Sequence, residues 1–543
     1  MHSVIDCVVV GYNDASFSEF LERTEMSKDH SGGYRHLLVN SLAFRGQRVK
    51  YPELLNATME AATGVPSRFH VGRMPNLGAI TLVSFLRRHD LRAELVNFYN
   101  EDKELLRQLL AERPSAVAIT TTFYFESQPI REIVDFVRAH SPSTKVIVGG
   151  PHVFNICTDH PPILQDVLFK EMGADVYIFD SQGEQTLARV CTELSRGAPD
   201  LSSIPNVIHT RDGKKFERGG REVENNDMEA NVVDWSTFDP GFLAPTVQTR
   251  TARSCAYKCA FCRYPVMAGA LNVTSVETVE RELRHLHSIG VTHLLFIDDT
   301  FNIPKTRFKD ICRMMIRNRF GFRWFSYFRC ANADAECFDL MAESGCAGVF
   351  LGIESGDDRV LKAMNKIATA DKYRDGIRRL NERGIITYSS FIIGHPGETE
   401  ETARNTLAFI DETRPTFYCL ETFFFDPKVP IAERAQEFGL SGRAYAWTHA
   451  GMDWRRASDL VEEGYRTITG STVLPLYSFD LWSVAYLMGQ GVELDRIKRF
   501  LSVAAEMLVQ GIGRERPVYP EHEGRLVSIF RAPGLQASGV PSR

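Results

Sequence analysis

The chain has 543 residues, enough for about three or four domains at roughly 150 residues per domain. Its 63 Lys and Arg residues against 69 Asp and Glu give a formal net charge of −6, and 44% of its residues are hydrophobic. This composition is typical of globular proteins and excludes disordered, collagen-like and membrane-embedded classes. The mild acidic balance, with no block of like charge, argues against an electrostatic nucleic-acid footprint. We therefore expect no nucleic-acid partner.

The apolar stretches are too short for export or membrane insertion. The amino-terminal run at 8–10 stops at Gly11, well short of a signal peptide's core. The most apolar later runs, 294–297 and 391–393, fall far below the roughly 20 residues that a membrane span needs. Eleven cysteines in a chain of this length are too few for a disulfide scaffold and indicate free thiols or metal ligands. The sequence predicts a cytoplasmic protein with no membrane partner.

The first part of the chain, residues 1–215, alternates between strand and helix patterns. Strand-like runs lie near 6–10, 93–98, 116–120, 145–148 and 176–179, with helical patterns between them. This alternation predicts an α/β domain with a Rossmann-like, doubly wound parallel sheet, whose ligands bind outside the carboxyl ends of the strands. Residues of about 23–70 interrupt the pattern and are expected to be an insertion. The polar segment 216–245 has no periodicity and is expected to be a linker.

A second β/α series follows the linker. Six strands are predicted near 246–251, 293–298, 323–329, 347–354, 385–393 and 417–424. Six strands with helix-length segments between them favour a partial (β/α)6 barrel over residues 246–426. Residues 427–543 are expected to form a mainly helical carboxyl-terminal region, with a disordered Pro/Gly/Ser-rich tail from residue 532.

Three cysteines follow the first barrel strand. Cys255, Cys259 and Cys262 are spaced CxxxCxxC. Three thiolates on one short loop can hold a 4Fe–4S cluster and leave one iron without a protein ligand. Structural zinc is the alternative, but it requires a fourth Cys or His, and none follows at finger-like spacing. The motif predicts a cluster with an open iron.

The segment Cys-Ala-Tyr-Lys-Cys-Ala-Phe-Cys after the first strand of a barrel resembles the signature of the radical S-adenosylmethionine (SAM) superfamily. The resemblance implies that the three cysteines ligate the cluster, that SAM chelates the open iron, and that one-electron reduction yields a 5′-deoxyadenosyl radical. It also implies SAM-binding roles for residues at or near strand ends: Phe261, Arg329, Glu354, Ser355, Gly394 and Pro396. Each also has a plain structural interpretation as a turn, cap or ion-pair residue.

The amino-terminal sheet ahead of such a barrel resembles the cobalamin-binding domain of cobalamin-dependent radical SAM enzymes. The matching segments are Pro-Asn-Leu-Gly at 75–78, Gly-Gly-Pro-His at 149–152 and Gly-Glu-Gln-Thr-Leu at 183–187. They imply cobalamin contacts at Gly149, Gly150, Gly183 and Glu184. No GxGxxG fingerprint is present, which weakens the dinucleotide alternative. The DxHxxG motif is also absent, which implies cobalamin without a histidine ligand to cobalt. The alternative is a domain that keeps the fold of its sheet but binds no cofactor.

Together the two resemblances imply a cobalamin-dependent radical SAM methyltransferase. One SAM would methylate cobalamin, a second would give the radical, and an unactivated centre of a small natural-product intermediate would receive the methyl group. A donor such as flavodoxin or ferredoxin would supply electrons. The alternatives are a cobalamin radical SAM cyclase, ring-contracting enzyme or oxidase that transfers no methyl group, and a sensor with a structural cluster.

The opening Asp-Cys-Val-Val-Val-Gly-Tyr-Asn at 6–13, followed by the insertion, resembles the P-methyltransferases of phosphinothricin-type antibiotic pathways. That resemblance implies an H-phosphinate substrate and a product with a C–P–C linkage. An anionic phosphinate requires cationic partners, for which Arg263, Arg329 and Lys428 are candidates. C-methylation of another natural product is the competing possibility.

Overall fold

The computed structural model describes residues 5–124, 126–196, 199–475, 480–514 and 519–531. The tail predicted to be disordered from residue 532 lies outside these residues. Within them the chain forms two compact units. Unit 1 contains the residues up to Ala15, together with Gly72–Gln248 and Asn272–Ile289, and unit 2 contains Ser16–Val71, Thr249–Leu271 and the described residues from Gly290 onward.

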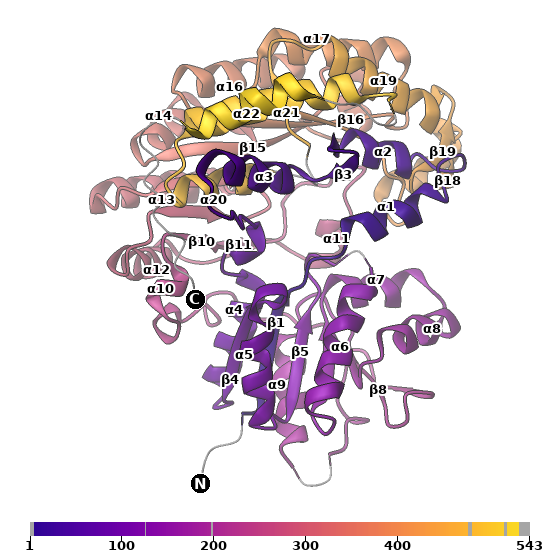
Figure 1. The fold of residues 1–543 in the computed structure, drawn as a ribbon, viewed down its shortest axis with the longest axis vertical. Coiled ribbons are helices and arrows are strands. Elements are labelled where there is room, and N and C mark those ends of the chain that lie inside the picture. The colour runs from indigo at the N-terminus through magenta and orange to yellow at the C-terminus, as the bar shows by residue number, and fades with distance from the viewer. Residues whose placement is uncertain (1–4, 125, 197–198, 476–479, 515–518, 532–543) are drawn as a thin grey trace. The chain divides into compact units, whose positions relative to one another are not determined.

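The core of unit 1 is a seven-stranded sheet in the order β4-β1-β5-β6-β7-β8-β9 (Figure 1). The first five strands in this order pair in parallel, β8 pairs antiparallel with β7, and β9 pairs antiparallel with β8. Their bounds are β1 (Cys7–Tyr12), β4 (Ala93–Phe98), β5 (Ala116–Thr120), β6 (Lys145–Gly149), β7 (Val176–Ile178), β8 (Val207–Thr210) and β9 (Phe216–Arg218). The predicted doubly wound sheet is confirmed, although β9 extends it into the expected linker.

Amphipathic helices connect these strands. In α6 the buried residues Ile130, Ile133, Val134 and Val137 follow the i, i+3, i+4, i+7 pattern of a single apolar stripe. In α4 the side chain of Asn76 caps the helix by accepting from the Ala79 N–H at 3.0 Å. The α-helices of unit 1 are α4 (Leu77–Arg88), α5 (Tyr99–Ala111), α6 (Gln128–His140), α7 (Pro151–Asp159), α8 (Pro162–Met172), α9 (Glu184–Leu194), α10 (Pro240–Leu243) and α12 (Val276–Ser288).

Unit 2 is built on a second seven-stranded sheet in the order β10-β13-β14-β15-β16-β17-β21. Consecutive strands from β13 to β21 pair in parallel, so their carboxyl ends share one edge. The bounds are β10 (Thr246–Thr249), β13 (His293–Phe296), β14 (Arg323–Tyr327), β15 (Cys346–Glu354), β16 (Ile386–Ile393), β17 (Phe417–Thr422) and β21 (Thr472–Val473). The six predicted strands are present, and β21 adds a seventh from the carboxyl-terminal region.

The predicted insertion belongs to unit 2 and not to the amino-terminal domain. The segment Ser16–Val71, which includes the predicted insertion, contains α1 (Phe17–Glu25), α2 (Gly33–Val39), the hairpin strands β2 (Leu42–Phe44) and β3 (Gln47–Val49), and α3 (Tyr51–Thr63). Helix α3 packs against α22 (Pro520–Arg531), and β2 packs against α21 (Leu494–Gly511). The side chain of Arg35 forms ion pairs with Asp459 at 2.8 Å and Glu462 at 2.6 Å. The residues in contact are more than 400 positions apart in the sequence, so no local sequence pattern predicts these contacts.

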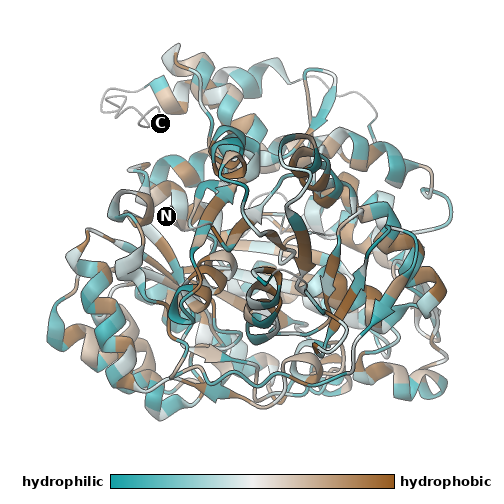
Figure 2. Cartoon of the chain, turned by 90° about the horizontal axis from the view of Figure 1, so that it is seen from below, coloured by the Kyte–Doolittle hydropathy of each residue, from teal (hydrophilic) through white to brown (hydrophobic). Residues whose placement is uncertain are grey.

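The carboxyl-terminal region is mainly helical, as predicted, but it also contains a three-stranded antiparallel sheet. That sheet consists of β18 (Ser441–Arg443), β19 (Ala446–His449) and β20 (Met452–Asp453). Hydrophobic residues, brown in Figure 2, gather on strands and on one side of many helices, while teal polar residues cover other helix faces. In the described part of the chain, no helix has both the length and the apolar character that a membrane crossing demands.

Candidate active site

The three cysteines lie on the loop between β11 (Ala252–Arg253) and α11 (Tyr264–Ala268) in unit 2. All three are free thiols; Cys259 is buried, whereas Cys255 and Cys262 are half-buried. The Cys255 Sγ lies 3.5 Å from the Thr300 Oγ1, just beyond the carboxyl end of β13. Burial raises the pKa of Cys262 to about 11. The loop therefore presents three thiols at the edge where barrel active sites form.

Among the described residues, no group of three His, Cys, Asp or Glu side chains converges on one position in a way that would hold a single metal ion. A 4Fe–4S cluster requires a different arrangement of ligands, because each thiolate binds a different iron of the cube. Three thiols on one short loop are compatible with that arrangement. The assignment of Cys255, Cys259 and Cys262 as ligands stays a prediction.

A buried carboxylate anchors the start of this loop. The fully buried Asp298 accepts hydrogen bonds from the Thr251 N–H and the Thr251 Oγ1, both at 2.6 Å. Arg307 donates to the Thr251 Oγ1 and carbonyl, both at 3.1 Å. The first carboxylate of the Asp298–Asp299 pair therefore fixes the turn that leads into the cysteine loop.

Arg329 supplies a buried cation beside the cysteine loop. Its guanidinium lies 3.7 Å from the centre of the Tyr257 ring, and Asn332 donates to the Tyr257 hydroxyl. The side chain is buried, and in the described structure its Nε and Nη2 have no hydrogen-bond partner. Guanidinium donors of this kind suit a carboxylate, so the residue fits the predicted contact with the SAM carboxylate.

Glu354 ends β15 in a left-handed conformation, with φ of 70°. Its Oε1 lies 3.0 Å from the Lys366 Nζ, and both side chains are buried. Burial opposes the charged form of Lys366, but the Glu354 charge outweighs it and raises the pKa of the lysine. A Cβ on Gly352 would lie 2.6 Å from the Glu354 Oε1, so glycine leaves room for this carboxylate.

Lys366 also links Glu354 to the cysteine loop, because its Nζ lies 5.5 Å from the centre of the half-buried Phe261 ring. The sequence analysis missed Lys366. It lies 12 residues after Glu354 in a short loop with no motif, so no spacing signal connects the two.

The turn at 394–398 follows β16 at the same edge. Gly394 has φ of +93°, and a Cβ there would lie 2.4 Å from the Trp447 ring, so only glycine fits. Its N–H donates to the Glu398 Oε2 at 2.5 Å. The His395 Nδ1 donates to the buried Pro396 carbonyl at 2.9 Å. Burial raises the pKa of Glu398 to about 8 and lowers the pKa of His395 to about 3, so both are neutral near pH 7.

Ser355 makes the contacts of a turn residue. Its side chain is fully buried, its Oγ lies 3.0 Å from the Thr406 Oγ1, and it accepts from the Asp357 N–H at 3.1 Å. These contacts fix the turn before α15 (Asp358–Ala363). A direct contact of Ser355 with SAM stays a prediction.

In unit 1, the ends of β5 and β6 form a close backbone cradle. Gly150 has φ of +104°, and a Cβ there would lie 2.9 Å from the Thr121 Oγ1. The Thr121 Oγ1 donates to the Gly149 carbonyl at 2.8 Å. In the same unit, beyond the end of β1, the Oδ1 of the buried Asn13 has no hydrogen-bond partner in the described structure. A buried acceptor without a partner beyond the carboxyl end of β1 fits the predicted entry of a nucleotide tail at this edge of the sheet.

The start of α9 is occupied by a side chain of the chain itself. Gly183 adopts φ of +78° as the N-cap, and Glu184 accepts from the Asn226 Nδ2 at 2.8 Å. The carboxylate of Glu224 accepts from the Gln185 N–H at 3.0 Å and the Thr186 N–H at 2.8 Å. An acidic residue from the expected linker therefore stabilises the helix N-terminus. The sequence analysis missed Glu224, because its partners lie about 40 residues away.

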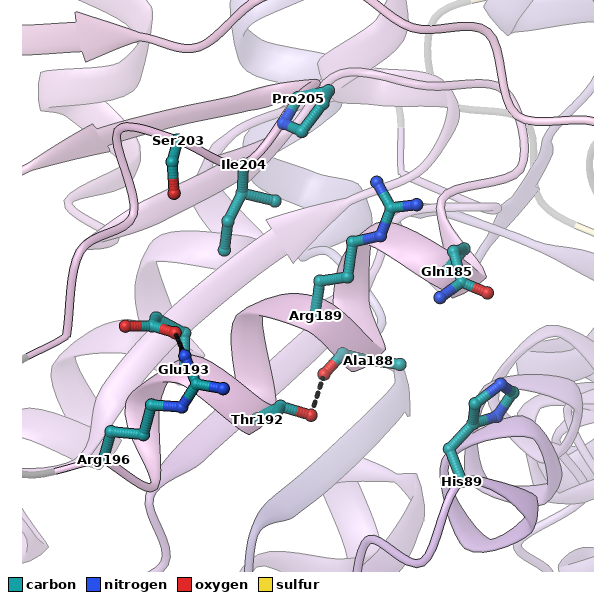
Figure 3. A pocket seen from close by; sticks show the side chains of 10 residues that line it. All are labelled: His89, Gln185, Ala188, Arg189, Thr192, Glu193, Arg196, Ser203, Ile204 and Pro205. Carbon is teal, nitrogen blue, oxygen red and sulfur yellow. Dashed lines mark hydrogen bonds and ion pairs between the residues drawn. The ribbon is translucent and has the colours of Figure 1, made fainter.

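A further pocket of unit 1, of about 390 Å³, lies beside α9 (Figure 3). Its charged side chains have ionic partners: Arg196 pairs with Glu193 at 2.5 Å and Arg189 with Glu222 at 3.5 Å. The lining residues are His89, Gln185, Ala188, Arg189, Thr192, Glu193, Arg196, Ser203, Ile204 and Pro205. The predicted contacts Gly149, Gly150, Gly183 and Glu184 are not among them, but Gln185 belongs to the segment 183–187 that resembles a cobalamin-binding sequence.

Comparison with known proteins agrees with this division of the chain. The B12 binding domain model matches residues 70–190, and the radical SAM superfamily model matches residues 249–410. An uncharacterized methyltransferase of Pyrococcus horikoshii is 26% identical over 347 residues, which is 62% of this chain and 72% of the relative.

Two solved structures share the fold. The radical SAM methyltransferase TsrM from Kitasatospora setae, determined with cobalamin and a 4Fe–4S cluster bound, has a TM-score of 0.55 at 19% identity and covers 84% of this chain and 96% of its own. The cobalamin-dependent SAM radical enzyme OxsB, with aqua-cobalamin and SAM bound, has a TM-score of 0.58 at 14% identity over 84% of this chain and 82% of its own.

The two matches follow one another in the order that the sequence predicts; the B12 binding match lies in unit 1 apart from residues 70–71, and the radical SAM match lies in unit 2 apart from residues 272–289. The chain therefore combines a B12 binding domain with a radical SAM superfamily domain, and its cofactors are cobalamin, SAM and a 4Fe–4S cluster.

Proposed function

We propose that this enzyme methylates an unactivated centre of a small molecule. The observation that carries the proposal is the joining of a B12 binding domain to a radical SAM domain with three free cysteines on one loop. The relative from Pyrococcus horikoshii is named a methyltransferase, and so is TsrM. When bound, the cluster with SAM supplies a one-electron route to a carbon-centred radical, and cobalamin supplies a methyl group.

In this scheme the chain's own residues bind the cofactors and position the reactants. Cys255, Cys259 and Cys262 hold iron through their thiolates, and Arg329 directs unused guanidinium donors at the carboxylate of SAM. The buried Lys366–Glu354 pair holds the end of β15 in place beside them. Fixed, buried groups keep the reactants in position and exclude water, which protects a reactive radical.

The H-phosphinate substrate is a finer proposal and depends on cations in the barrel. Of the three candidates, Arg263 is already neutralised by Asp426 at 3.2 Å, and Lys428 is exposed. Arg329 is buried beside the cysteine loop. Incubation with a small H-phosphinate and SAM labelled with deuterium in the methyl group tests this class, because P-methylation would place the label on phosphorus.

The test of the proposed function is anaerobic reconstitution with iron, sulfide and hydroxocobalamin, followed by iron, corrin and SAM-cleavage analysis. We expect one cluster and one corrin per chain and formation of 5′-deoxyadenosine. The triple variant Cys255→Ala, Cys259→Ala, Cys262→Ala should lose the cluster and the cleavage but keep the corrin. Cys312→Ala is the matched control, because Cys312 is a free buried thiol on α13 (Lys305–Asn318), away from the loop.

The outcomes separate the possibilities. A cluster without a corrin would remove cobalamin chemistry and leave a plain radical SAM enzyme. A corrin and a cluster, with deoxyadenosine formed but no label transferred from SAM to any product, would favour a cyclase or oxidase. A triple variant that still cleaves SAM would overturn the assignment of the cysteines.

A further inference from the structure

The segment that follows α15 lies against the cysteine loop. The Ala260 N–H donates to the Met364 carbonyl at 2.8 Å, and the Asn365 Nδ2 donates to the Lys258 carbonyl at 2.7 Å. Lys258 and Ala260 flank the buried Cys259, one of the three predicted cluster ligands. Two hydrogen bonds therefore hold this segment directly beside the predicted cluster site.

Ile367 is the outlier of this segment. Its φ is +52°, in the left-handed region, where a β-branched residue is strained. Its side chain is 68% exposed, so packing inside the protein does not offset the strain. Asparagine adopts this conformation more easily, as Asn365 does with φ of +53°. Strained residues concentrate at functional sites, and an apolar side chain that is both strained and exposed is explained by contact with another molecule.

Two cations lie on the same surface. Lys258 and Lys362 are exposed, and neither forms an ion pair with any residue that the structure describes. Both lysines are bonded through their carbonyls to Asn365, whose N–H donates to the Lys362 carbonyl at 3.1 Å and whose side chain donates to Lys258. Lys258, Lys362, Asn365 and Ile367 are all exposed and form one surface, the loop patch. It combines unmatched positive charge with an exposed apolar side chain.

The position of the loop patch suits the delivery of electrons. Reductive cleavage of SAM takes one electron from the cluster, and that electron has to be replaced. Electron transfer between proteins slows steeply with distance, so a carrier has to dock beside the cluster. Lys258 is the neighbour of Cys259 in the chain, which makes the loop patch a short route to the cluster site.

The chemistry of the loop patch selects the carrier. Unpaired lysines attract an acidic partner and steer its approach. The apolar dimethylbenzene edge of a flavin is a suitable contact for an exposed isoleucine. An acidic flavoprotein that carries single electrons meets both requirements.

We propose that Lys258, Lys362 and Ile367 form the docking surface for an acidic one-electron carrier of the flavodoxin type. In the complex, the anionic flavin hydroquinone gives up one electron and becomes the neutral semiquinone, the oxidised cluster gains that electron, and no proton moves. This inference rests on the proposed function, because an enzyme that cleaves SAM at its cluster needs a supply of electrons.

The experiment measures binding of an acidic flavodoxin to the reconstituted holoenzyme by calorimetry, at low and at high salt. We expect the double variant Lys258→Glu, Lys362→Glu to bind at least about 10-fold more weakly than the wild type at low salt, with a smaller difference at high salt, which screens charges. The rate of 5′-deoxyadenosine formation with reduced flavodoxin, divided by the rate with dithionite, should fall by a similar factor, because dithionite needs no docking surface. Unchanged binding and an unchanged ratio would overturn the proposal.

The control carries the same change of net charge elsewhere. Lys170→Glu, Lys498→Glu alters exposed residues of α8 and α21 and should bind flavodoxin within about 2-fold of the wild type. Equal weakening by the two double variants would reduce the effect to net charge and contradict the assignment of the surface. If the Lys258→Glu, Lys362→Glu protein does not bind iron, Lys362→Glu alone takes its place, since Lys362 lies outside the cysteine motif.

The variant Ile367→Gly separates docking from folding. Glycine adopts a positive φ without strain, so the variant should unfold at or above the wild-type temperature. Loss of the apolar contact should nevertheless weaken flavodoxin binding several-fold. Wild-type affinity in this variant would show that Ile367 takes no part in docking.

Failure of this inference is distinguishable from failure of the proposed function. Wild-type enzyme that forms 5′-deoxyadenosine with dithionite and transfers label from SAM, but does not bind flavodoxin, retains the function and loses the inference. Tighter binding of an acidic ferredoxin than of flavodoxin would overturn the choice of a flavin carrier. Wild-type enzyme that binds flavodoxin at the loop patch yet forms no deoxyadenosine with either reductant keeps the docking surface but has lost the function on which its role rests.

Discussion

At the scale of single residues, the barrel interior depends on charges that are matched inside the protein. Lys366 and Glu354 are both buried and 3.0 Å apart, with few other partners for either charge. A buried ion pair contributes little over an apolar pair, but removing one member leaves a buried charge uncompensated. The pair is therefore a sensitive point of the fold.

We predict that Lys366→Met lowers the free energy of unfolding of unit 2 by about 3–5 kcal/mol. The double variant Lys366→Met, Glu354→Gln should lose clearly less unfolding free energy, because it contains no unpaired buried carboxylate. Urea denaturation followed by tryptophan fluorescence measures both. Equal losses in the single and double variants would show that the pair is not coupled.

Glu398 makes stability depend on pH. Burial raises the pKa of Glu398 from 4.5 to about 8 in the folded protein. The folded state then binds the proton more tightly than the unfolded state, so this contribution to stability is complete below pH 4.5 and is lost as the pH rises toward 8.

We predict that Glu398→Gln makes the unfolding free energy less dependent on pH between 5 and 8. The difference in slope should approach about 1.4 kcal/mol per pH unit. The glutamine oxygen can still accept from the Gly394 N–H, so the turn keeps its hydrogen bond. Denaturation at pH 5, 6, 7 and 8 provides the comparison, and parallel curves for the two proteins would contradict the shifted titration.

At the scale of elements, the turn after β16 shows why some glycines are fixed by their neighbours. Gly394 and Gly290 have similar positive φ values of +93° and +90°. A Cβ on Gly394 would collide with Trp447, whereas a Cβ on Gly290 would meet no atom within 4 Å. A side chain would therefore strain the backbone at both positions, but it would clash with a neighbouring side chain only at Gly394.

We predict that Gly394→Ala destabilises unit 2 more than Gly290→Ala does. Gly290→Ala should cost about 1 kcal/mol, the usual range for an unfavourable φ. Gly394→Ala adds the displacement of a buried indole and should exceed this by about 1–3 kcal/mol. Thermal unfolding of both variants gives the difference, and equal melting temperatures would show that Trp447 moves aside freely.

Sequence patterns predicted the elements whose signal is local. The β/α alternation of both sheets follows from periodic apolar residues, and the cysteine loop follows from its spacing. The strands β18–β20 were missed because they are two to four residues long and carry polar or glycine residues such as Ser441 and Gly442. Lys366 and Glu224 were not identified as site residues, because their partners are brought to them by tertiary contacts, which produce no periodic pattern in the sequence.

At the scale of the whole molecule, ion pairs and a backbone hydrogen bond hold the amino-terminal segment to the rest of unit 2, in addition to the packing of α3 and β2. Arg35 reaches Asp459 and Glu462 of α19 (Trp454–Thr467), and the Gly32 N–H donates to the Tyr445 carbonyl at 2.7 Å. Because Arg35 is only about one-quarter exposed, its two ion pairs are better shielded than those on the surface.

We predict that Arg35→Ala speeds amide hydrogen exchange in α2 by about 5- to 30-fold, the factor expected for a loss of one or two kcal/mol. Exchange in the helices of unit 1 should not change. Lys28→Ala is the control, because Lys28 pairs only weakly with the nearby Glu25 at 3.8 Å. Unchanged exchange in α2 would show that other contacts hold the segment.

The packing of α3 against α22 also constrains how the chain folds during synthesis. Helix α3 buries Tyr51, Leu54 and Leu55, but α22 begins only at Pro520, about 450 residues later. At about 5–20 residues per second, the ribosome needs roughly 20–90 s to cover that distance. During this interval α3 lacks its packing partner α22, and the apolar surface that α22 covers in the folded protein is accessible to chaperones or to other nascent chains. We therefore expect the highest yield of folded protein when the host cells grow at a lower temperature and produce additional chaperones.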